Sequence, residues 1–584
     1  MLFAVWHPRD QLLAPSLQSR VSALVESGEA RFDGRNGAIA VWGSARLVPS
    51  ERGACAHGDC DRSGAALPGR PIVRLEEDAL VVSAGTLPQV PLYFVIAEDE
   101  RYVVVCSRLA PLATIFRDAP IRARRLVSLI AYGLETDTSE TVFAGVRRLR
   151  ACETITAEGA RVRVDRVFPH IADRYRRGTA ADLGREFLVR LSGAVQRAMG
   201  ASKHVAVFVS GGLDSSGILA LALADSRGPA NRKLDAISLQ LTGPGDDRPH
   251  FAELARALGV APVRLFAADA APWFRQSLCM DAQPGSLPST CLFLFAGTVA
   301  AKSEADVVLT GVSGDKVSGG VFPFAGLTQW ARRGHVLGAL SHALRLRLPW
   351  PMGRMLRMRY VLSPLVPERV RRWRRRFGRR PEAPRWMTSR AKALWVETRA
   401  ADGGLHLPLP NSPDSQLECL CTRSYMSDTC DTVGQLASAT GCLPVDAFLD
   451  EDFVRFVLEI EPVLLNCGHE YRGLYRLATK DLLPPSLRMR RDKGAFEPGI
   501  AAAAGNPGVA FLRELSSLEA LAGHGLANPK PLRPAMEACF GALQRDGRGE
   551  FIGPVPGDEY IPDVWQLLSA EAFLREHGRA REVS

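Results

Sequence analysis

The sequence predicts an α/β protein in two parts. The first is an antiparallel β-sandwich module of α+β type, and the second is a parallel-sheet domain with a mostly helical C-terminal part. Short runs rich in β-branched and aromatic residues, separated by Gly, Asp and Glu turns, fill residues 1 to about 170. From about Asp182 to Leu309 strands alternate with helices, the pattern of a parallel sheet. From about Gln416 the apolar spacing is mainly helical.

In the N-terminal part, the apolar runs are short and rich in β-branched and aromatic residues, as in strands. The expected strands are Ala38–Trp42, Ala79–Ser83, Leu92–Ile96 and Tyr102–Cys106. Segments 145–149 and 161–165 are expected to close the module as a hairpin. We place this module at residues 1–175.

The second part begins with a helix over Leu183–Met199, where Leu, Phe, Val and Ala recur at helical spacing. Strand Val205–Val209 then leads through a glycine-rich turn into the apolar helix Gly217–Leu223. The next expected elements are strand 234–241, helix 250–258, strand 263–266 and strand 305–309. We assign residues 180–584 to this domain and treat the very basic segment 345–391 as an insert within it.

Composition and charge narrow the class of protein. The chain has 584 residues, of which 46% are hydrophobic and 23% charged, and these proportions exclude a disordered or collagen-like chain. The formal net charge of +10 favours anionic partners. An apolar run of about 18 residues and a signal peptide are both missing, so we expect a cytoplasmic protein without a transmembrane segment. The twelve cysteines include no CxxC pair, which favours reduced, structural cysteines.

The strongest motif is Ser210-Gly-Gly-Leu-Asp-Ser-Ser216, which lies directly between an apolar strand and a helix. Glycines let the backbone approach a polyphosphate, and successive N–H groups at a helix N-terminus bind its oxygens. Asp214 would repel phosphate unless it holds a cation, so it is a natural Mg²⁺ ligand. The lysine of a P-loop is missing, which excludes that class of nucleotide site.

This motif resembles the pyrophosphate loop of the ATP-pyrophosphatase superfamily, with its adenine nucleotide α-hydrolase-like fold. Three further stretches resemble the asparagine synthetase branch. They are the second glycine-rich loop Thr310–Gly320, the helix stretch Glu253–Gly259 after the adenine-binding strand, and the stretch Arg476–Lys493 that carries the catalytic lysine. The resemblance covers about residues 180 to 500 in order and spacing.

The resemblance implies an AMP-forming carbon–nitrogen ligase that uses ATP and Mg²⁺. It places Asp214 and Asp315 on the metal, Lys493 over the tetrahedral intermediate and α-phosphate, and Arg491 near phosphate. The residues implied in nucleotide binding are Ser210, Gly211, Gly212, Asp214, Ser215, Ser216, Leu239, Gly311 and Gly314.

Two positions depart from the pattern of this branch. Segment Gly145–Glu153 resembles the end of the branch's glutamine amidotransferase domain, yet Leu2 stands where that domain has its nucleophilic cysteine. Without a thiol or hydroxyl there, acyl transfer from glutamine cannot begin. Val312 stands where the branch places an acidic or tyrosine base, so the identity of the general base is open. An amine on the substrate itself must then be the nucleophile.

This logic is similar to that of the β-lactam synthetases and of the lasso peptide macrolactam synthetases (cyclases). The large basic chain and the cluster Arg369–Arg380 favour an acidic peptide, although a charge run is commonly a solvated helix face. We therefore expect ring closure in a ribosomally made peptide for antibiotic biosynthesis. The resemblance implies three partners: the leader-processed precursor peptide, a leader peptidase and a leader-binding protein. Nucleic acid is not an expected partner.

Three alternatives stay open. An asparagine synthetase-like or β-lactam synthetase-like ligase would act on a small molecule, and Leu2 and Val312 disfavour the first of these. A tRNA-modifying adenylating enzyme fits the net charge, but the sequence shows no appended RNA-binding motif. A peptide-binding relic without activity would have no need of Asp214, Asp315 and Lys493.

Overall fold

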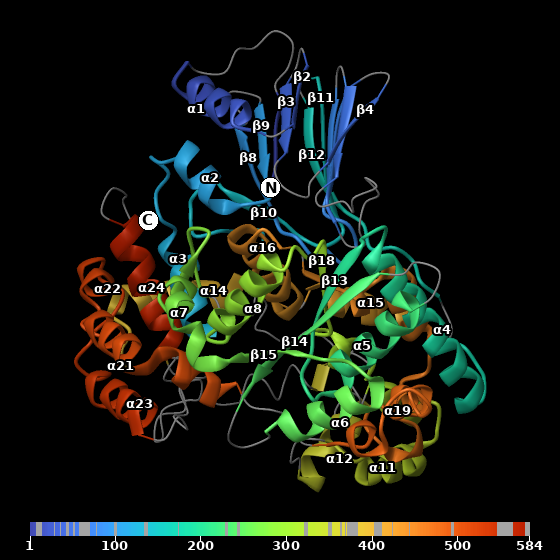
Figure 1. The fold of residues 1–584 in the computed structure, drawn as a ribbon. Coiled ribbons are helices and arrows are strands. Elements are labelled where there is room, and N and C mark those ends of the chain that lie inside the picture. Colours follow the sequence, from blue (N-terminus) through green and yellow to red (C-terminus); the bar gives the residue numbers. More distant parts are fainter. Residues whose placement is uncertain are drawn as a thin grey trace.

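The computed structural model describes most of the chain, and Figure 1 draws it as a ribbon. The described residues are 1–6, 15–28, 30–34, 37–41, 46–50, 53–57, 70–76, 79–97, 102–132, 138–159, 161–172, 175–227, 232–241, 246–285, 287–319, 325–348, 353–362, 365–367, 369–370, 383–401, 412–422, 424–442, 444–491, 496–545 and 564–578.

The N-terminal part contains two six-stranded antiparallel sheets that pack face to face (Figure 1). The first sheet has the order β10-β8-β9-β1-β3-β2 and the second the order β12-β11-β7-β6-β5-β4. Their bounds are β1 Leu2–Trp6, β2 Ala30–Gly34, β3 Gly37–Val41, β4 Arg46–Ser50, β5 Gly53–His57, β6 Ile72–Glu76, β7 Ala79–Ser83, β8 Leu92–Ala97, β9 Tyr102–Cys106, β10 Arg147–Leu149, β11 Glu153–Glu158 and β12 Arg161–Arg166.

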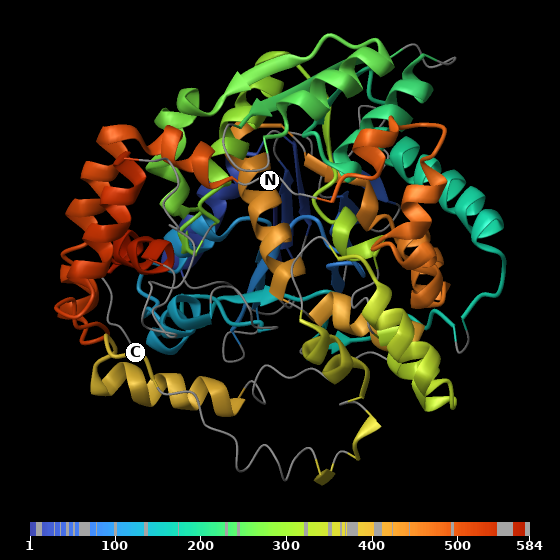
Figure 2. The ribbon, with the colours of Figure 1, turned by 90° about the horizontal axis from the view of Figure 1, so that it is seen from below.

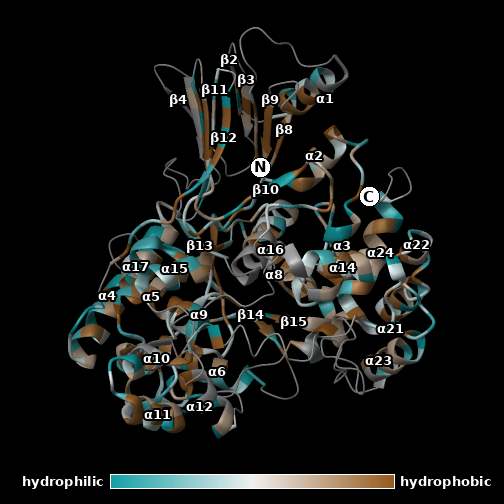
Figure 3. Cartoon of the chain, turned by 180° about the vertical axis from the view of Figure 1, so that it is seen from behind, coloured by the Kyte–Doolittle hydropathy of each residue, from teal (hydrophilic) through white to brown (hydrophobic). Residues whose placement is uncertain are grey.

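Side chains alternate between the two faces of the first sheet, so each face contributes to a different hydrophobic core. On β1, Leu2, Ala4 and Trp6 face the second sheet, while Phe3 and Val5 face the helices. Helices α1 Pro15–Glu26 and α2 Leu109–Ile115 lie against the outer face of the first sheet, and α3 Ala123–Tyr132 continues the same core below it (Figure 1). Hydrophobic residues are correspondingly frequent along β8 and β9 (Figure 3).

The expected closing hairpin was wrong. Segment 147–149 is β10, which pairs with β8 in the first sheet, whereas β12 pairs with β11 in the second. The chain changes sheets between them through a turn in which Cys152 has a positive φ of 64°. The alternation of Thr154 and Thr156 with buried Ile155 and Ala157 was the signal for β11.

The second part is built on a five-stranded sheet of order β15-β14-β13-β18-β19, in which every pair is parallel. The strands are β13 His204–Phe208, β14 Lys233–Gln240, β15 Val263–Phe266, β18 Val307–Thr310 and β19 Pro444–Asp446. The predicted mixed α/β fold with a parallel sheet is confirmed, and the short edge strand β19 was not among the predicted strands.

Both faces of the parallel sheet are covered by helices. Val205 and Val207 pack with α4 and α5 on one face, while Ala206 and Val308 pack with α8 and Cys442 on the other. The bounds are α4 Ala180–Met199, α5 Leu213–Ser226, α6 Arg248–Leu258, α7 Ala271–Phe274, α8 Thr290–Lys302 and α9 Gly314–Val317. Thr179 caps α4 by accepting a hydrogen bond from the N–H of Asp182, and α4 begins there.

The yellow-green helices near residues 325–345 and the red helices near the C-terminus lie on opposite sides of the molecule (Figure 2). Helices α10 Ala325–Arg332, α11 Val336–Arg345 and α12 Arg354–Leu362 form a small bundle with its own core. The later helices are α14 Ser389–Ala401, α15 Pro413–Thr422, α16 Ser424–Thr440, α17 Glu451–Glu459, α18 Pro462–Leu465, α19 Gly473–Ala478, α20 Pro485–Arg488, α21 Glu497–Leu515, α22 Glu519–Gly523, α23 Arg533–Arg545 and α24 Val564–His577.

One hydrophobic core joins the two parts of the chain. It runs from Leu126 and Ile130 on α3 to Trp395 on α14 and to Trp565 and Phe573 on α24. The proposed boundary between residues 175 and 180 stays a prediction, and so do the limits of the basic insert at residues 345–391. Residues 371–382 of that insert lie outside the described part. Within that part, we find no helix with an apolar stretch sufficient to cross a bilayer.

Candidate active site

The first glycine-rich loop joins β13 to α5, and its serines bond one another. The N–H of Ser210 donates to Ser215 Oγ over 3.1 Å, and the N–H of Gly212 donates to Ser210 Oγ over 3.1 Å. Gly212 is the N-cap of α5 and has no side chain to cap it. The first N–H groups of this helix therefore have no side-chain acceptor from their cap, which suits a phosphate.

The second glycine-rich loop follows β18, the strand beside β13, and abuts the first loop. A Cβ atom on Gly314 would lie 2.3 Å from Cγ of Asp214, and one on Gly311 would lie 3.0 Å from the backbone nitrogen of Ser215. Only glycine permits such an approach. The two loops thus meet at the carboxyl edge of the parallel sheet, where open α/β sheets bind ligands.

Arg472, which the sequence did not single out, binds Asp214. Its Nη1 donates to Asp214 Oδ2 over 2.9 Å, and its Nη2 donates to Asp214 Oδ1. Its Nε donates to Ser318 Oγ over 2.8 Å, which ties it to the end of the second loop as well. Burial lowers the pKa of the Arg472 guanidinium to about 9, so it stays charged at neutral pH.

The segment that presents Arg472 has an unusual backbone. Gly468, His469 and Arg472 have φ values of 67°, 58° and 62°, and such values are uncommon for residues with a Cβ. Asn466 stabilises this conformation, because its Oδ1 accepts from the N–H of Arg472 over 2.9 Å. Tyr471 Oη donates to the carbonyl of Asp315 over 2.8 Å. Left-handed non-glycine residues are typical of functional sites, where the surroundings determine the backbone.

Asp446, at the end of β19, supports the second loop. Its carboxylate accepts from the N–H of Ser313 over 2.7 Å and from the N–H of Phe448 over 3.1 Å. Burial raises the pKa of this carboxyl to about 6. Gln89 of the N-terminal part bonds the backbone of Asp446 in both directions, so the two parts of the chain meet directly behind the loop.

Of the neighbouring Arg490 and Arg491, it is Arg490 that contacts the first glycine-rich loop, although the sequence pointed to Arg491. Arg490, which was not predicted, is buried, and its Nη1 donates to the carbonyl of Gly211 over 3.1 Å and to Asp247 Oδ1 over 2.5 Å. The predicted Arg491 is half exposed and donates to Glu470 Oε1 over 2.9 Å. The same oxygen accepts from Arg347 Nη1 over 2.7 Å. Lys493 lies outside the described residues, so its role stays a prediction.

Three other predicted positions are placed as follows. Leu239 lies on β14, opposite Leu265 of β15, and is partly buried against the sheet core. Val312 is 40% exposed in the second loop, where its side chain offers no base. Leu2, the first residue of β1, is buried between the two N-terminal sheets and offers no nucleophile.

The donor chemistry fits ATP and a hard divalent cation. Asp214 and Asp315 lie on the two abutting loops, and carboxylate oxygens are the ligands that Mg²⁺ prefers. Asp214 already has the guanidinium of Arg472 as a partner, so an ion there would share this carboxylate with Arg472. The roles of these residues in binding stay predictions.

Comparison with models of protein families supports the resemblance to asparagine synthetases. The family model described as asparagine synthase matches residues 186–574, about two thirds of the chain. Comparison with curated proteins finds no match.

Solved structures give weak likenesses only. One is described as the allosteric regulatory enzyme of purine biosynthesis, with 9% identity, 45% of this chain and 80% of that chain covered, and a TM-score of 0.19. Glutamine phosphoribosylpyrophosphate amidotransferase from B. subtilis, complexed with ADP and GMP, has 10% identity, 53% and 80% coverage and a TM-score of 0.18. The U34-tRNA thiolase NcsA from Methanococcus maripaludis, with its 4Fe-4S cluster, has 13% identity, 47% and 98% coverage and a TM-score of 0.20.

TM-scores near 0.2 support no conclusion about activity. From the family match over residues 186–574, the chain belongs to the asparagine synthase family of ATP-dependent ligases.

Proposed function

We propose that this protein closes a macrolactam ring in a ribosomally made peptide of the lasso type. In the proposed reaction, the side-chain carboxylate of an Asp or Glu is adenylated by ATP. The N-terminal amine of the same peptide then forms an isopeptide bond. The products are the cyclic peptide, AMP and pyrophosphate.

The observation that carries the ATP-dependent step is the contact between the two glycine-rich loops. Gly314 lies against the carboxylate of Asp214, and Asp315 follows it directly. Backbone N–H groups, two carboxylates and the buried Arg472 therefore gather at one edge of the sheet. A polyphosphate with a divalent cation is the ligand that matches these groups.

The chain's own residues divide the proposed work. Ser210, Ser215 and the first N–H groups of α5 hold the departing pyrophosphate, and Arg472 offers a second cation to it. When bound to Asp214 and Asp315, Mg²⁺ would neutralise charge on the phosphates. As the substrate carboxylate oxygen attacks the α-phosphorus, the bond to pyrophosphate breaks. The amine then attacks the acyl carbon, loses a proton and expels AMP, with Lys493 as the proposed cation for the developing oxyanion.

Two side chains support an amine that belongs to the substrate. Leu2 is 1% exposed, and its backbone is held by Ser107, whose Oγ accepts from the N–H of Leu2 and whose N–H donates to its carbonyl, both over 2.9 Å. A nucleophile for glutamine hydrolysis is therefore not offered at the start of β1. Val312 likewise offers no base in the second loop.

The bundle α10–α12 supports a peptide substrate. Leu337 on α11 and Met355 on α12 are more than 80% exposed, and Arg345 and Arg354 are exposed on the same two helices. Exposed apolar side chains among arginines suit an acidic peptide with apolar residues. We extend the proposal to the partners of such a pathway, a leader peptidase and a leader-binding protein.

The test supplies ATP and Mg²⁺ with one of two substrate sets. One is a synthetic precursor peptide from the neighbouring open reading frame, and the other is free aspartate with ammonia. The proposal predicts AMP release with the peptide and loss of one water from the peptide by mass spectrometry. Asp214→Asn and Asp315→Asn should abolish both signals. Turnover of aspartate and ammonia without any change in the peptide would replace this proposal with a small-molecule amide ligase.

A further inference from the structure

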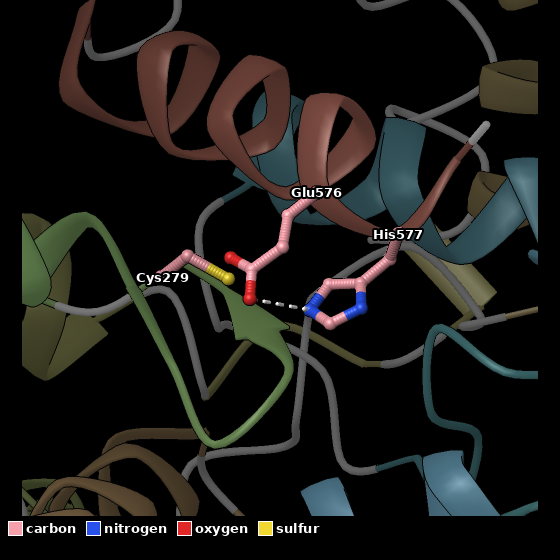
Figure 4. A group of neighbouring side chains, drawn as sticks. All are labelled: Cys279, Glu576 and His577. Carbon is pink, nitrogen blue, oxygen red and sulfur yellow. Dashed lines mark ion pairs between the residues drawn. The ribbon is translucent and has the colours of Figure 1, made fainter.

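A second group of metal-binding side chains lies away from the glycine-rich loops. Cys279 begins the two-residue strand β16 (Cys279–Met280), and Glu576 and His577 are the last two residues of α24. The Cys Sγ, a Glu carboxylate oxygen and a His ring nitrogen all lie within 4.8 Å of one another. Figure 4 shows the Glu576 carboxylate close to both the Cys279 sulfur and the His577 ring, and the dashed line marks the 3.6 Å ion pair between Glu576 and His577. We propose that Cys279, Glu576 and His577 bind one zinc ion.

The donor set selects the metal. Thiolate, imidazole and carboxylate together are typical of zinc, whereas Mg²⁺ prefers oxygen ligands alone. Cys279 is not in a disulfide, so its sulfur is available. Three protein ligands leave a fourth position for water, and the Glu576 side chain is 65% exposed, so solvent reaches the site.

The surroundings favour a cation and hold the ligands in place. The three-residue group includes the C-terminal end of a fourteen-residue helix, where the partial negative charge of the helix dipole stabilises a cation. The ring of His577 packs against two aromatic rings, with centroids 6.2 Å from Phe143 and 5.1 Å from Phe573. Cys279 is fixed by its strand, because β16 pairs with β17 (Gln283–Pro284).

The place of the group shows which elements a bound metal would connect. The turn of the β16–β17 hairpin carries Asp281, whose carboxylate accepts from the N–H groups of Leu109 and Ala110 at the start of α2. A metal at Cys279 would therefore link the C-terminal helix α24 to a hairpin that also holds the N-terminal part. This proposal does not depend on the substrate of the ligase.

The experiment titrates the full-length protein, previously treated with a chelator, with Zn²⁺ against a competing chromophoric chelator. We expect one equivalent of tightly bound zinc in wild type. Cys279→Ser and His577→Gln should weaken binding by at least about 100-fold, because each removes a ligand. Cys539→Ser, at another partly buried cysteine, is the matched control and should bind as wild type does.

A second measurement keeps the test decisive if a variant folds poorly. Co²⁺ in wild-type protein should give a sulfur-to-metal charge-transfer band, which is direct evidence of a thiolate ligand. Circular dichroism and pyrophosphate release should show that Cys279→Ser is folded. Zinc binding that survives Cys279→Ser, or cobalt binding without the charge-transfer band in wild type, would overturn the proposal.

Discussion

Arg472 donates hydrogen bonds to both carboxylate oxygens of Asp214, although 258 residues separate the two in the chain. The pair brings a buried positive charge to the carboxylate at the start of α5, inside the expected phosphate site. A guanidinium has five N–H donors, of which two bond the Asp214 carboxylate and a third bonds Ser318. Arg472 thus connects both loops and is the natural first target for mutation.

Arg472→Ala should reduce pyrophosphate release by about 100-fold or more, because a charged donor aimed at developing negative charge is removed. Arg472→Lys should recover part of the rate, since lysine keeps the charge but lacks the planar fork. Initial rates with saturating ATP and Mg²⁺ measure this. The Ala variant also leaves Asp214 without its partner, so its unfolding must be measured in parallel. A folded Arg472→Ala protein with the wild-type rate would remove Arg472 from the site.

Gly314→Ala should damage the site through contact alone. The added methyl group would lie 2.3 Å from Asp214 Cγ, so one of the loops must move. We expect a loss of about 1–3 kcal/mol in the free energy of unfolding and a rate reduced by about 100-fold. Gly353→Ala is the matched control, because a Cβ there meets nothing within 4 Å. Equal behaviour of the two variants would show that the loops do not abut.

Glu470→Gln should slow chemistry without weakening ATP binding. Oε1 of Glu470 accepts from both Arg347 and Arg491, and Arg491 lies two residues before Lys493. Loosening this segment should lower kcat by about 10-fold, while KM for ATP stays near the wild-type value because Arg490 still holds the first loop.

A carboxylate with two arginine partners elsewhere controls for this change. Glu186 Oε1 on α4 accepts from Arg176 and Arg190, both over 3.2 Å, so Glu186→Gln should leave kcat unchanged. Arg491→Gln combined with Glu470→Gln should be no slower than Glu470→Gln alone, since Glu470→Gln already breaks the interaction with Arg491. Additive losses would show that Glu470 does not act through Arg491.

The bundle α10–α12 should lose stability in mild acid. Burial, and then the charge of His469, lower the pKa of His342 from 6.5 to about 4. In the unfolded chain His342 therefore binds a proton near pH 6.5, whereas in the folded chain it binds one only near pH 4. Stability is complete above the first value and falls toward the second, by about 2 kcal/mol between about pH 7 and pH 5.

Amide hydrogen exchange of α11, measured as a function of pH, reports this loss of stability in the helix that carries His342. His342→Phe keeps an aromatic ring beside His469, whose ring centroid is 4.7 Å away, but it has no proton to bind. Its exchange should depend less on pH over the same window. An identical pH dependence in the variant and the wild type would assign the effect to another group.

Local patterns predicted the parts of the site that are local in the chain. The strand, the glycines and the helix around Ser210–Ser216 lie together because a strand–turn–helix unit is specified by adjacent residues. Arg472, Asp446 and Arg490 were missed because each reaches the loops from more than 100 residues away, through contacts that no periodicity encodes. The left-handed backbone at Arg472 could not be predicted from the residue type, because this conformation is usually adopted by glycine or asparagine.

The N-terminal part shows the same limit. Runs rich in β-branched and aromatic residues predicted strands 79–83, 92–96 and 102–106, which the structure forms as β7, β8 and β9. Their pairing was not accessible, since β10 joins one sheet and β12 the other after a turn at Cys152. The two hydrogen bonds between Gln89 and the backbone of Asp446 depend on how the two parts of the chain pack, and no pattern in a single sequence predicts that packing.

The most direct test of the central claim follows an oxygen atom. A precursor peptide whose acceptor side-chain carboxylate carries ¹⁸O is incubated with the enzyme, ATP and Mg²⁺, and the nucleotide product is analysed by mass spectrometry. Adenylation of that carboxylate predicts AMP with one ¹⁸O, formed in equal amount with the dehydrated peptide. Unlabelled AMP, or ADP with labelled phosphate, would contradict the account.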